Sequence, residues 1–397
     1  MSFPIFTFIQ LYTFHKSIKL NTDSNYSRLI PQPPDYTFDW DHLTHQFDWI
    51  QNMRNVPQDP IHHAEGDVWI HTRMVAEELT CLQGWQELPP RERTLLFWAA
   101  LLHDVAKPFT TVVSENGRVG APGHAPKGAR LARQILWKGI PEPIPFSIRE
   151  EIVALVKYHG APLWNMGRKD SLKILLKAGL HCNLHQLALL AEADVRGRIC
   201  ADKDELLERI DFFREYAKEA QSYTQPYPFA NALTRFTFFQ KEDSYPDYVP
   251  YDDTWGEVIL MSGLPGAGKD TWIQQNGGGL PVISLDEIRR EMKVKPTDKQ
   301  GAVIQAAKEK AREYLRAKQP FIWNATNITP VTRKPLVELF TTYKARVKIV
   351  YIETLYQTLM QQNEQREAVV PLEVIERMIR KWEVPDLVEA HEVEYVV

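Results

Sequence analysis

Cysteine is scarce in this chain of 397 residues, which contains three: Cys81, Cys182 and Cys200. An odd number of irregularly spaced cysteines does not make the disulfide framework of a small secreted domain, so we expect a reducing, cytoplasmic setting. None of them belongs to a Cys-x-x-Cys pair. The sequence therefore disfavours a zinc site built from thiolates, and a metal site would have to use other ligands.

Long apolar runs are lacking as well. The apolar start, MSFPIFTFIQLYTFH, is too short to cross a bilayer and carries neither a basic segment nor a cleavage site of small residues. We interpret residues 1–36 as an N-terminal extension that is disordered, adds a strand to a sheet, or results from an upstream start codon. No membrane partner is expected.

Neither sign of charge dominates, because the formal net charge is −4 at pH 7. This balance argues against a basic coat over the whole surface, although a local basic groove for nucleic acid remains compatible with it. Apolar residues make up 44% of the sequence, which at this length is enough for two hydrophobic cores.

The pattern of apolar residues changes along the chain. From residue 37 to 220 they recur at helical spacing, as in RERTLLFWAALLHDVAK, whereas residues 221–253 are rich in proline and tyrosine and read as a linker. From residue 254 to 397 short apolar strands alternate with helices, which is typical of a parallel sheet. The sequence therefore predicts a multidomain protein, an all-α domain followed by an α/β domain.

A phosphate-binding loop is predicted at the start of the α/β domain. The segment GLPGAGKDT follows a predicted strand and precedes a predicted helix, which is the context that makes this motif credible. Its glycines let backbone N–H groups surround phosphate oxygens, and Lys269 would reach the β- and γ-phosphates. We expect ATP or another nucleoside triphosphate, with Mg²⁺, to be bound by Gly263, Gly266, Ala267, Gly268, Lys269, Asp270 and Thr271.

Asp270 departs from the motif, because a hydroxyl normally stands there and coordinates magnesium. A carboxylate also binds magnesium, but it adds negative charge beside a triphosphate. Either Asp270 holds the metal, directly or through water, or Thr271 supplies the hydroxyl one residue later. The sequence leaves both open.

Three further residues are candidates for phosphoryl transfer. Asp286 lies at the end of the second strand, where it would act as the general base for an attacking hydroxyl. Its other reading is an N-cap for the next helix, and the two roles are compatible. Arg289 would hold an anionic acceptor, or is a solvated surface residue. Arg366 would belong to a lid over the transferring phosphate, or is simply exposed.

The α/β half resembles the polynucleotide 5′-kinase family. The resemblance covers about residues 258–382 and rests on the order of the glycine loop, SLDEIRREM, NATNIT with Arg333, and a lid ending in VVP. It implies that Asp286 activates a nucleic-acid 5′-OH and that Arg289 contacts the phosphate next to the acceptor sugar. The family lid carries two arginines four residues apart; Arg366 matches the second, and Gln362 replaces the first.

The helical half carries dispersed histidines and aspartates on buried helix faces. LLHDVAKP ends an apolar helix with His103 and Asp104, and Lys107 follows on the same face. Burying an unpaired charge costs on the order of several kcal/mol, and a shared cation would offset that cost. Imidazole and carboxylate together favour a divalent transition metal (Ni, Co, Mn, Fe, Cu or Zn). The expected ligands are His71, His103, Asp104, His124, His159 and Asp194.

These residues are similar to the H…HD…D signature of the HD phosphohydrolase superfamily. The resemblance implies that His71, His103, Asp104 and Asp194 form a first metal site, and that His124 and His159 serve a second. It is nearest to the HD domains of some bacterial CCA-adding enzymes, which hydrolyse 2′,3′-cyclic phosphates and 2′-nucleotides. Lys107 would hold substrate phosphate, or is a plain surface lysine. His62 and His63 either line the pocket or sit in a loop.

The two halves together resemble bacterial HD-phosphatase/polynucleotide-kinase enzymes that heal both ends of cleaved RNA. That resemblance implies RNA or DNA ends as partners, a separate ligase acting afterwards, and no membrane; a homodimer is compatible with the sequence. Two other interpretations stay open. One is a small-molecule kinase, for a nucleoside or sugar, fused to an HD nucleotidase. The other is a regulatory protein that binds nucleotides without turnover.

Overall fold

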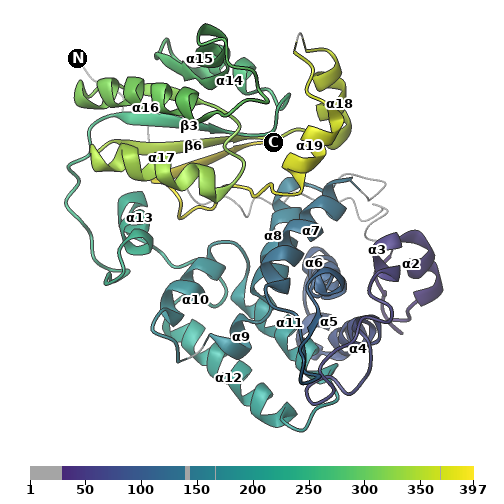
Figure 1. Ribbon diagram of the computed structural model, residues 1–397. Helices are drawn as coiled ribbons and strands as arrows, with labels where there is room; N and C mark the ends of the chain where they lie inside the picture. The colour runs from purple at the N-terminus through teal and green to yellow at the C-terminus, as the bar shows by residue number, and fades with distance from the viewer. Residues whose placement is uncertain (1–28, 139–143, 166, 367) are drawn as a thin grey trace. The chain divides into compact units, whose positions relative to one another are not determined.

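The computed structural model describes residues 29–138, 144–165, 167–366 and 368–397. Within these residues the chain divides into two compact units (Figure 1), one of residues 29–159 with 186–208 and the other of residues 160–185 with 209–397. Most of the predicted N-terminal extension, residues 1–28, lies outside the described residues. The expected domain boundaries near residues 220 and 254 stay predictions.

The first unit is built almost entirely of helices. Helix α6 is its centre, since every residue from Thr94 to Leu102 is buried, as expected for a helix that is apolar on all sides. Helices α4 and α8 pack against α6, and α7 packs against α8. The elements of this unit are α2 (Trp40–Gln46), α3 (Asp48–Gln51), α4 (Val68–Cys81), α5 (Gln83–Gln86), α6 (Pro90–Leu102), η1 (Lys107–Phe109), β1 (Val112–Val113), β2 (Val119–Gly120), α7 (His124–Lys138), α8 (Phe146–Tyr158) and most of α11 (Leu184–Arg196).

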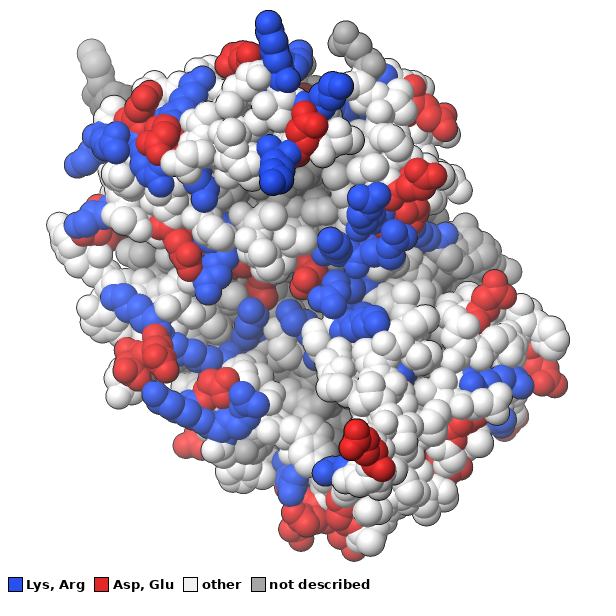
Figure 2. Space-filling view, in the orientation of Figure 1, with Lys and Arg blue, Asp and Glu red and all other residues white. Residues whose placement is uncertain are grey.

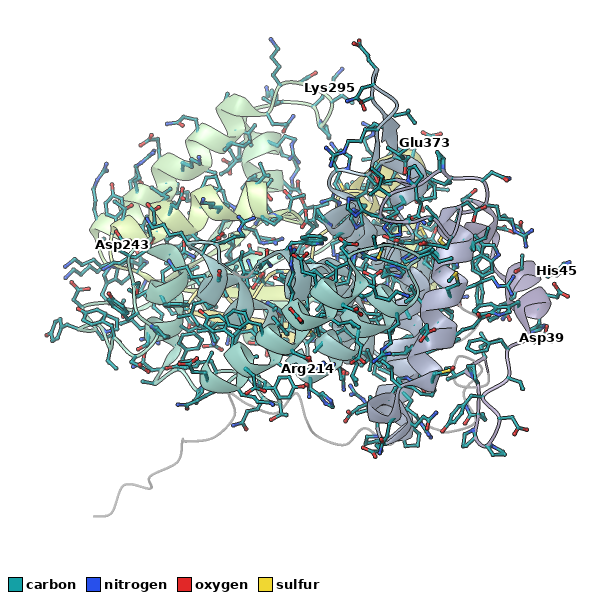
Figure 3. All side chains as sticks on the ribbon, turned by 90° about the horizontal axis from the view of Figure 1, so that it is seen from below. Asp39, His45, Arg214, Asp243, Lys295 and Glu373 are labelled. Atoms are coloured by element: carbon teal, nitrogen blue, oxygen red, sulfur yellow. The ribbon has the colours of Figure 1, made fainter. Side chains whose placement is uncertain are left out.

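Side-chain caps fix where several of these helices begin. Asp39 accepts a hydrogen bond from the backbone N–H of His42 at the start of α2, and His45 lies in the last turn of that helix; Asp39 and His45 are labelled in Figure 3. Asp67 accepts from Ile70 N–H at the start of α4. Such caps satisfy backbone donors that the first helical turn leaves free.

The second unit begins with helices and continues as an α/β fold. Its elements are α9 (Ala161–Trp164), α10 (Ser171–Gly179), most of α12 (Lys203–Glu219), α13 (Ala232–Gln240), β3 (Glu257–Ser262), α14 (Lys269–Asn276), β4 (Val282–Ser284), α15 (Leu285–Glu291), α16 (Gly301–Arg316), β5 (Phe321–Asn324), α17 (Pro330–Thr342), β6 (Arg346–Ile352), α18 (Tyr356–Glu364), α19 (Leu372–Ile379) and β7 (Glu392–Val396).

The sheet of this unit has five strands in the order β4-β5-β3-β6-β7, and all its pairings are parallel. Helices α16 and α17 pack on it through Val303, Ala307, Phe340 and their neighbours, which join the strand residues in one apolar core. The predicted fold class, an all-α part followed by an α/β part with a parallel sheet, is confirmed.

On the face drawn in Figure 2, lysine and arginine side chains are interspersed with aspartate and glutamate. No helix in the described part of the chain is both long enough and apolar enough to cross a membrane.

Candidate active sites

Six predicted metal ligands come together in the helical unit from five separate helices or helix ends. His71 lies in the second turn of α4, His103 and Asp104 follow the end of α6, and His124 begins α7. His159 follows the end of α8, and Asp194 lies near the end of α11. Five of the six are buried, at 0–5% exposure, and His124 is partly buried. The helix packing thus gathers polar groups from distant parts of the chain in an apolar interior.

All four imidazoles turn the same nitrogen toward the centre. The Nδ1 atoms of His103, His124 and His159 lie 2.7, 2.8 and 2.8 Å from the carbonyl oxygens three residues earlier in the chain. His71 Nδ1 lies 2.8 Å from a carboxylate oxygen of Glu65. Because Nδ1 must carry the proton to donate to the carbonyl oxygens, the neutral rings of His103, His124 and His159 each present an unprotonated Nε2. That is the tautomer a metal ligand requires.

Asp104 stands between two groups of these nitrogens. Its Oδ2 lies 3.1 Å from His103 Nε2 and 3.8 Å from His71 Nε2, whereas its Oδ1 lies 3.6 Å from His124 Nε2. The predicted ligand atoms therefore form two sets, each within 4.8 Å: His71, His103 and Asp104, and Asp104, His124 and His159. A third set of the same size joins His71 to His63 and Glu65. Asp194 adds a second carboxylate, with Oδ1 3.1 Å from His71 Nε2.

The donor set fits divalent cations better than it fits a hydrogen-bonded core. His103 Nε2 and Asp104 Oδ1 are buried and have no hydrogen-bond partner among the described residues. The Nε2 atoms of His124 and His159 face each other at 3.2 Å, although neither carries a proton in the tautomer set by its Nδ1 contact. A cation between such lone pairs would remove these costs, and imidazole with carboxylate suits a transition metal.

Two cationic side chains hold the carboxylates ionised. Lys107 Nζ lies 2.7 Å from Asp104 Oδ2 and donates to Gln58 Oε1 at 2.6 Å. Arg198 donates to both oxygens of Asp194. Burial, the largest single influence, would raise the pKa of Asp104 and of Asp194. The lowering effects together outweigh it, Lys107 with neighbouring histidines at Asp104 and Arg198 with neighbouring histidines at Asp194, so the pKa of each falls well below its usual range. Both carboxylates are thus ready to bind a cation.

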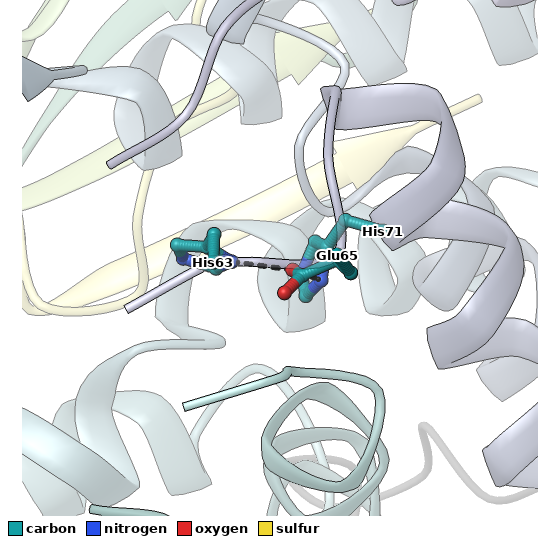
Figure 4. A group of neighbouring side chains, drawn as sticks. All are labelled: His63, Glu65 and His71. Atoms are coloured by element: carbon teal, nitrogen blue, oxygen red, sulfur yellow. Dashed lines mark hydrogen bonds and ion pairs between the residues drawn. The ribbon is translucent and has the colours of Figure 1, made fainter. Parts of the chain in front are cut away.

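Glu65 is a site residue that sequence reasoning missed. Its buried carboxylate lies 2.8 Å from Nδ1 of both His63 and His71 (Figure 4) and also accepts from Ile199 N–H at 2.9 Å. It therefore fixes the ring of a predicted ligand from outside the ligand set. His63 belongs to this arrangement, whereas His62 is half exposed and lies 3.6 Å from Asp202.

The phosphate-binding loop has the expected form in the α/β unit. Gly263, Gly266 and Gly268 have φ values of 152°, 83° and 100°, where side chains are disfavoured. A Cβ on Gly263 would lie 2.5 Å from the carbonyl oxygen of Ile352, so that position also needs glycine for space. Ala267 completes the loop, and α14 starts at Lys269.

Lys269 folds back onto the loop that precedes it. Its Nζ donates to the carbonyl oxygens of Gly263 and Leu264 at 2.9 and 2.8 Å. Burial lowers the pKa of Lys269 to about 8, and Arg366 acts in the same direction. The arginine predicted for the lid is therefore near the lysine of the loop.

Asp286 and Arg289 are placed together at the strand ends. Asp286 lies in the first turn of α15 and accepts from Arg289, which also donates to Gln300 Oε1 at 2.8 Å. The alternative role of Asp286 as N-cap is wrong, because Ser284 caps this helix through Glu287 N–H. With its carboxylate largely exposed, Asp286 is free to meet an acceptor from solvent.

The lid segment packs on the loop. Backbone atoms of Leu359 and Asn363 in α18 lie 3.5–3.7 Å from where a Cβ on Gly266 would be. Asn363 bonds both backbone groups of Val370, which fixes the turn after α18. Arg366 is half-buried, with Nη1 lacking a partner among the described residues, and Gln362 is exposed. The alternative of a simply exposed Arg366 is thus wrong.

Arg333, part of the kinase-like pattern, is a fully buried structural residue. Its guanidinium donates to both oxygens of Glu389 at 2.6 and 2.7 Å and to the carbonyl oxygens of Asn327 and Glu383 at 3.0 Å. All its polar contacts are within the fold, so it is not available to a substrate.

Comparison with known proteins agrees with this division. Residues 67–205 match the family described as the HD domain, and residues 258–385 match the family described as the AAA domain. The first match contains all six predicted metal ligands, and the second contains the phosphate-binding loop, Asp286, Arg289 and Arg366.

Curated relatives cover part of the chain. A stretch of 161 residues is 28% identical to the Multifunctional CCA protein of Actinobacillus pleuropneumoniae serotype 5b (strain L20), and the serotype 7 (strain AP76) protein gives the same values. The match covers 38% of this chain and 36% of each relative. The chain thus spans about a third of the length of these relatives.

A solved structure of a candidate kinase from Chloroflexus aurantiacus is similar over 36% of this chain and 86% of its own, at 17% identity and a TM-score of 0.32. The family matches and the site geometry lead to one conclusion: this chain carries an HD domain in residues 67–205 and a kinase-like P-loop domain of the AAA type in residues 258–385.

Proposed function

We propose that the protein heals both ends of a broken RNA strand. The kinase-like domain would transfer phosphate from ATP to a 5′-OH, and the HD domain would remove a 2′,3′-cyclic, 2′- or 3′-phosphate. The observation that carries the proposal is the convergence of four imidazole Nε2 atoms on two carboxylates, in a chain that also holds a phosphate-binding loop. Addition of phosphate by one domain and removal of phosphate by the other suit the two ends of one cleaved strand.

In the HD domain, the residues divide by role. His71, His103, Asp104 and Asp194 would hold one cation, and His124 and His159 with Asp104 a second. A divalent metal there lowers the pKa of water and stabilises negative charge that develops on phosphate oxygens. Lys107, whose Nζ lies 2.7 Å from Asp104 Oδ2, would bind substrate phosphate.

In the kinase-like domain, the 5′-oxygen of the acceptor would attack the γ-phosphorus of ATP. The new P–O bond forms as the bond to the β–γ bridging oxygen breaks, so ADP leaves and the hydroxyl proton passes to Asp286. Lys269 and Arg366 would stabilise charge on the transferring group. Arg289 would exchange its contact with Asp286 for the acceptor's phosphate.

The test uses one RNA that carries a 5′-OH and a 2′,3′-cyclic phosphate, incubated with ATP and a panel of divalent metals. Both ends are then read by mass spectrometry. We expect a 5′-phosphate and a 2′,3′-diol from the wild-type protein. His103→Ala should lose only the second product and Lys269→Ala only the first. Equal phosphate release by wild type and His103→Ala would refute the assignment of the HD site.

Acceptor length separates this proposal from a small-molecule kinase. A repair enzyme should phosphorylate a 5′-OH oligonucleotide far better than a nucleoside, since the acceptor's own phosphate meets Arg289. Preference for the nucleoside or a sugar would favour the small-molecule alternative. Binding of ATP without product at either end would instead indicate a regulatory protein.

The proposed reaction sets the partners. A healed 5′-phosphate and 2′,3′-diol are the substrates of a nucleic-acid ligase, so a separate ligase would complete the repair. Such an enzyme would work in the cytoplasm, where ATP and RNA are at hand. A homodimer is compatible with the proposal, which does not require one.

A further inference from the structure

The metal-holding groups of the phosphate-binding loop are arranged unusually in this chain. P-loop proteins commonly hold Mg²⁺ with a hydroxyl directly after the loop lysine and with an aspartate elsewhere in the site. Here an aspartate, Asp270, follows the lysine. A neutral residue, Asn324, lies across from it at the carboxyl end of β5.

The fold brings these two residues together. Strand β5 pairs in parallel with β3, with Trp323 opposite Leu260, so β5 ends beside the loop that follows β3. Asn324 Nδ2 donates to Asp270 Oδ1 at 2.7 Å, across 54 positions of sequence. Asp270 is exposed in the first turn of α14 and Asn324 is half-buried. The pair thus lies at the mouth of the loop, on its open side.

The remaining oxygens of the pair are available to a ligand. Among the described residues, Asp270 Oδ2 and Asn324 Oδ1 have no hydrogen-bond partner, since the bond between the two residues is the one polar side-chain contact that either makes. Carboxylate and amide oxygens are ligands that Mg²⁺ accepts. Thr271, one residue further along α14, has no such link to a strand end.

We propose that Asp270 and Asn324 together hold the Mg²⁺ of the bound nucleotide. Relative to the common arrangement, the carboxylate follows the loop lysine and the neutral group lies at the end of the neighbouring strand. The inference rests on the proposed use of MgATP. One carboxylate remains, so the net charge facing the cation is the same. Asn324 orients the exposed carboxylate through Nδ2.

An exchange of residues in the full chain tests this directly. The variants are Asp270→Ser, Asn324→Asp and the double variant with both changes. Calorimetry would measure ATP binding with and without Mg²⁺, and electron paramagnetic resonance would measure Mn²⁺ binding in the presence of ADP. These readouts need no acceptor, so they do not depend on whether RNA is the substrate.

We expect Asp270→Ser to weaken Mn²⁺ binding at least tenfold while metal-free ATP binds as well as before or better. The double variant should recover to within about threefold of wild type, because it restores one hydroxyl and one carboxylate. Gln275→Ala, an exposed change on the same helix, serves as the control and should match wild type. Circular dichroism would verify folding of each variant.

Two results would overturn the inference: unchanged metal binding in Asp270→Ser, or a double variant no better than the worse single variant. Loss of Mn²⁺ binding on Thr271→Ala with Asp270→Ser unaffected would assign the metal to Thr271 instead. If the expected metal pattern holds but no 5′-OH oligonucleotide is phosphorylated, the proposed function fails and the metal assignment stands. A wild-type protein that binds no metal–nucleotide would refute both.

Discussion

The orientation of the imidazole rings is what makes the histidine cluster a site rather than a polar core. A core histidine usually satisfies both ring nitrogens within the fold. In this cluster, Nδ1 of all four rings contacts an oxygen while the Nε2 atoms face carboxylates and one another. The ring orientations, more than the residue types, distinguish a metal-binding arrangement here.

Glu65→Gln should weaken metal binding without removing a ligand. The Glu65 carboxylate accepts from His63 Nδ1 and Ile199 N–H and lies 2.8 Å from His71 Nδ1. An amide cannot face three nitrogens in this way, because one of its two polar groups is itself a donor. Loss of an outer-shell carboxylate costs roughly 10- to 100-fold in metal affinity in known sites, and we expect that range. Competition with a chelating dye, followed by metal analysis of the purified protein, would measure it.

The control for this prediction is His62→Ala, a change in the same loop at a residue outside the cluster. Metal affinity should be unchanged in that variant. Wild-type affinity in Glu65→Gln would contradict the positioning role and leave Glu65 as a buried structural carboxylate.

Sequence reasoning found the ligands but not the residues that support them. His71, His103 and Asp194 fall on apolar helix faces, where a polar group needs an explanation, and the family resemblance grouped them. Glu65 lies in a loop with no periodicity, so its burial had no signal in the sequence. Arg198 had a weak signal in the sequence, because it stands four residues after Asp194, the spacing of neighbours on one helix face.

At the scale of elements, buried ion pairs tie helices to strand-end loops. Arg333 of α17 joins the loop after β5, through Asn327, to the segment before β7, through Glu383 and Glu389. These segments are far apart in the sequence. The arginine therefore shapes the carboxyl edge of the sheet without facing the nucleotide.

Arg333→Met should destabilise the second unit while leaving its chemistry in place. The change keeps most of the side-chain volume but strands the Glu389 carboxylate, and removing one partner of a buried pair costs about 3–5 kcal/mol. Denaturant unfolding followed by tryptophan fluorescence would measure the loss. Lys334→Met, at the next and largely exposed position, should cost less than about 0.5 kcal/mol. Equal effects of the two changes would contradict the structural role.

Gly263→Ala should abolish nucleotide binding by distorting the loop. The new Cβ would lie 2.5 Å from a backbone oxygen of β6, at a φ of 152°, so the backbone must move. Gly301→Ala, at the start of α16, meets nothing within 4 Å and should be neutral or stabilising by up to about 1 kcal/mol. ATP binding measured by calorimetry would decide, and normal affinity in Gly263→Ala would refute the requirement for glycine.

Most strands of the sheet were predictable and one was not. Runs such as EVILMS and RVKIVYI are apolar enough to be buried on both faces, which is typical of central parallel strands. Strand β7 alternates glutamate with apolar residues and is only half-buried at the edge of the sheet. Its period of two was the available signal, but it is short and polar, and sequence analysis did not assign it.

At the scale of the whole molecule, the two domains present different donors to their cations. The HD cluster offers four imidazole nitrogens and two carboxylates, whereas the kinase-like site offers oxygen from Asp270, Asn324 and the nucleotide itself. Imidazole favours transition metals and oxygen favours magnesium. The sequence predicted a transition metal in one domain and magnesium in the other. It did not indicate that this difference in metal preference would allow the two activities to be measured separately by the choice of ion.

Metal removal and replacement should therefore separate the two activities in the intact protein. After chelation both ends of the test RNA should stay unprocessed. Added Mg²⁺ should restore 5′-phosphorylation but little phosphate removal, while Mn²⁺, Ni²⁺ or Co²⁺ should restore the second activity. Restoration of both activities by Mg²⁺ alone would contradict the assignment of a nitrogen-rich metal centre to the HD domain. The comparison is made at equal protein concentration with His103→Ala and Lys269→Ala beside wild type. Under every metal each variant should lack one activity, so an ion that restores phosphate removal to His103→Ala would place that chemistry elsewhere in the chain.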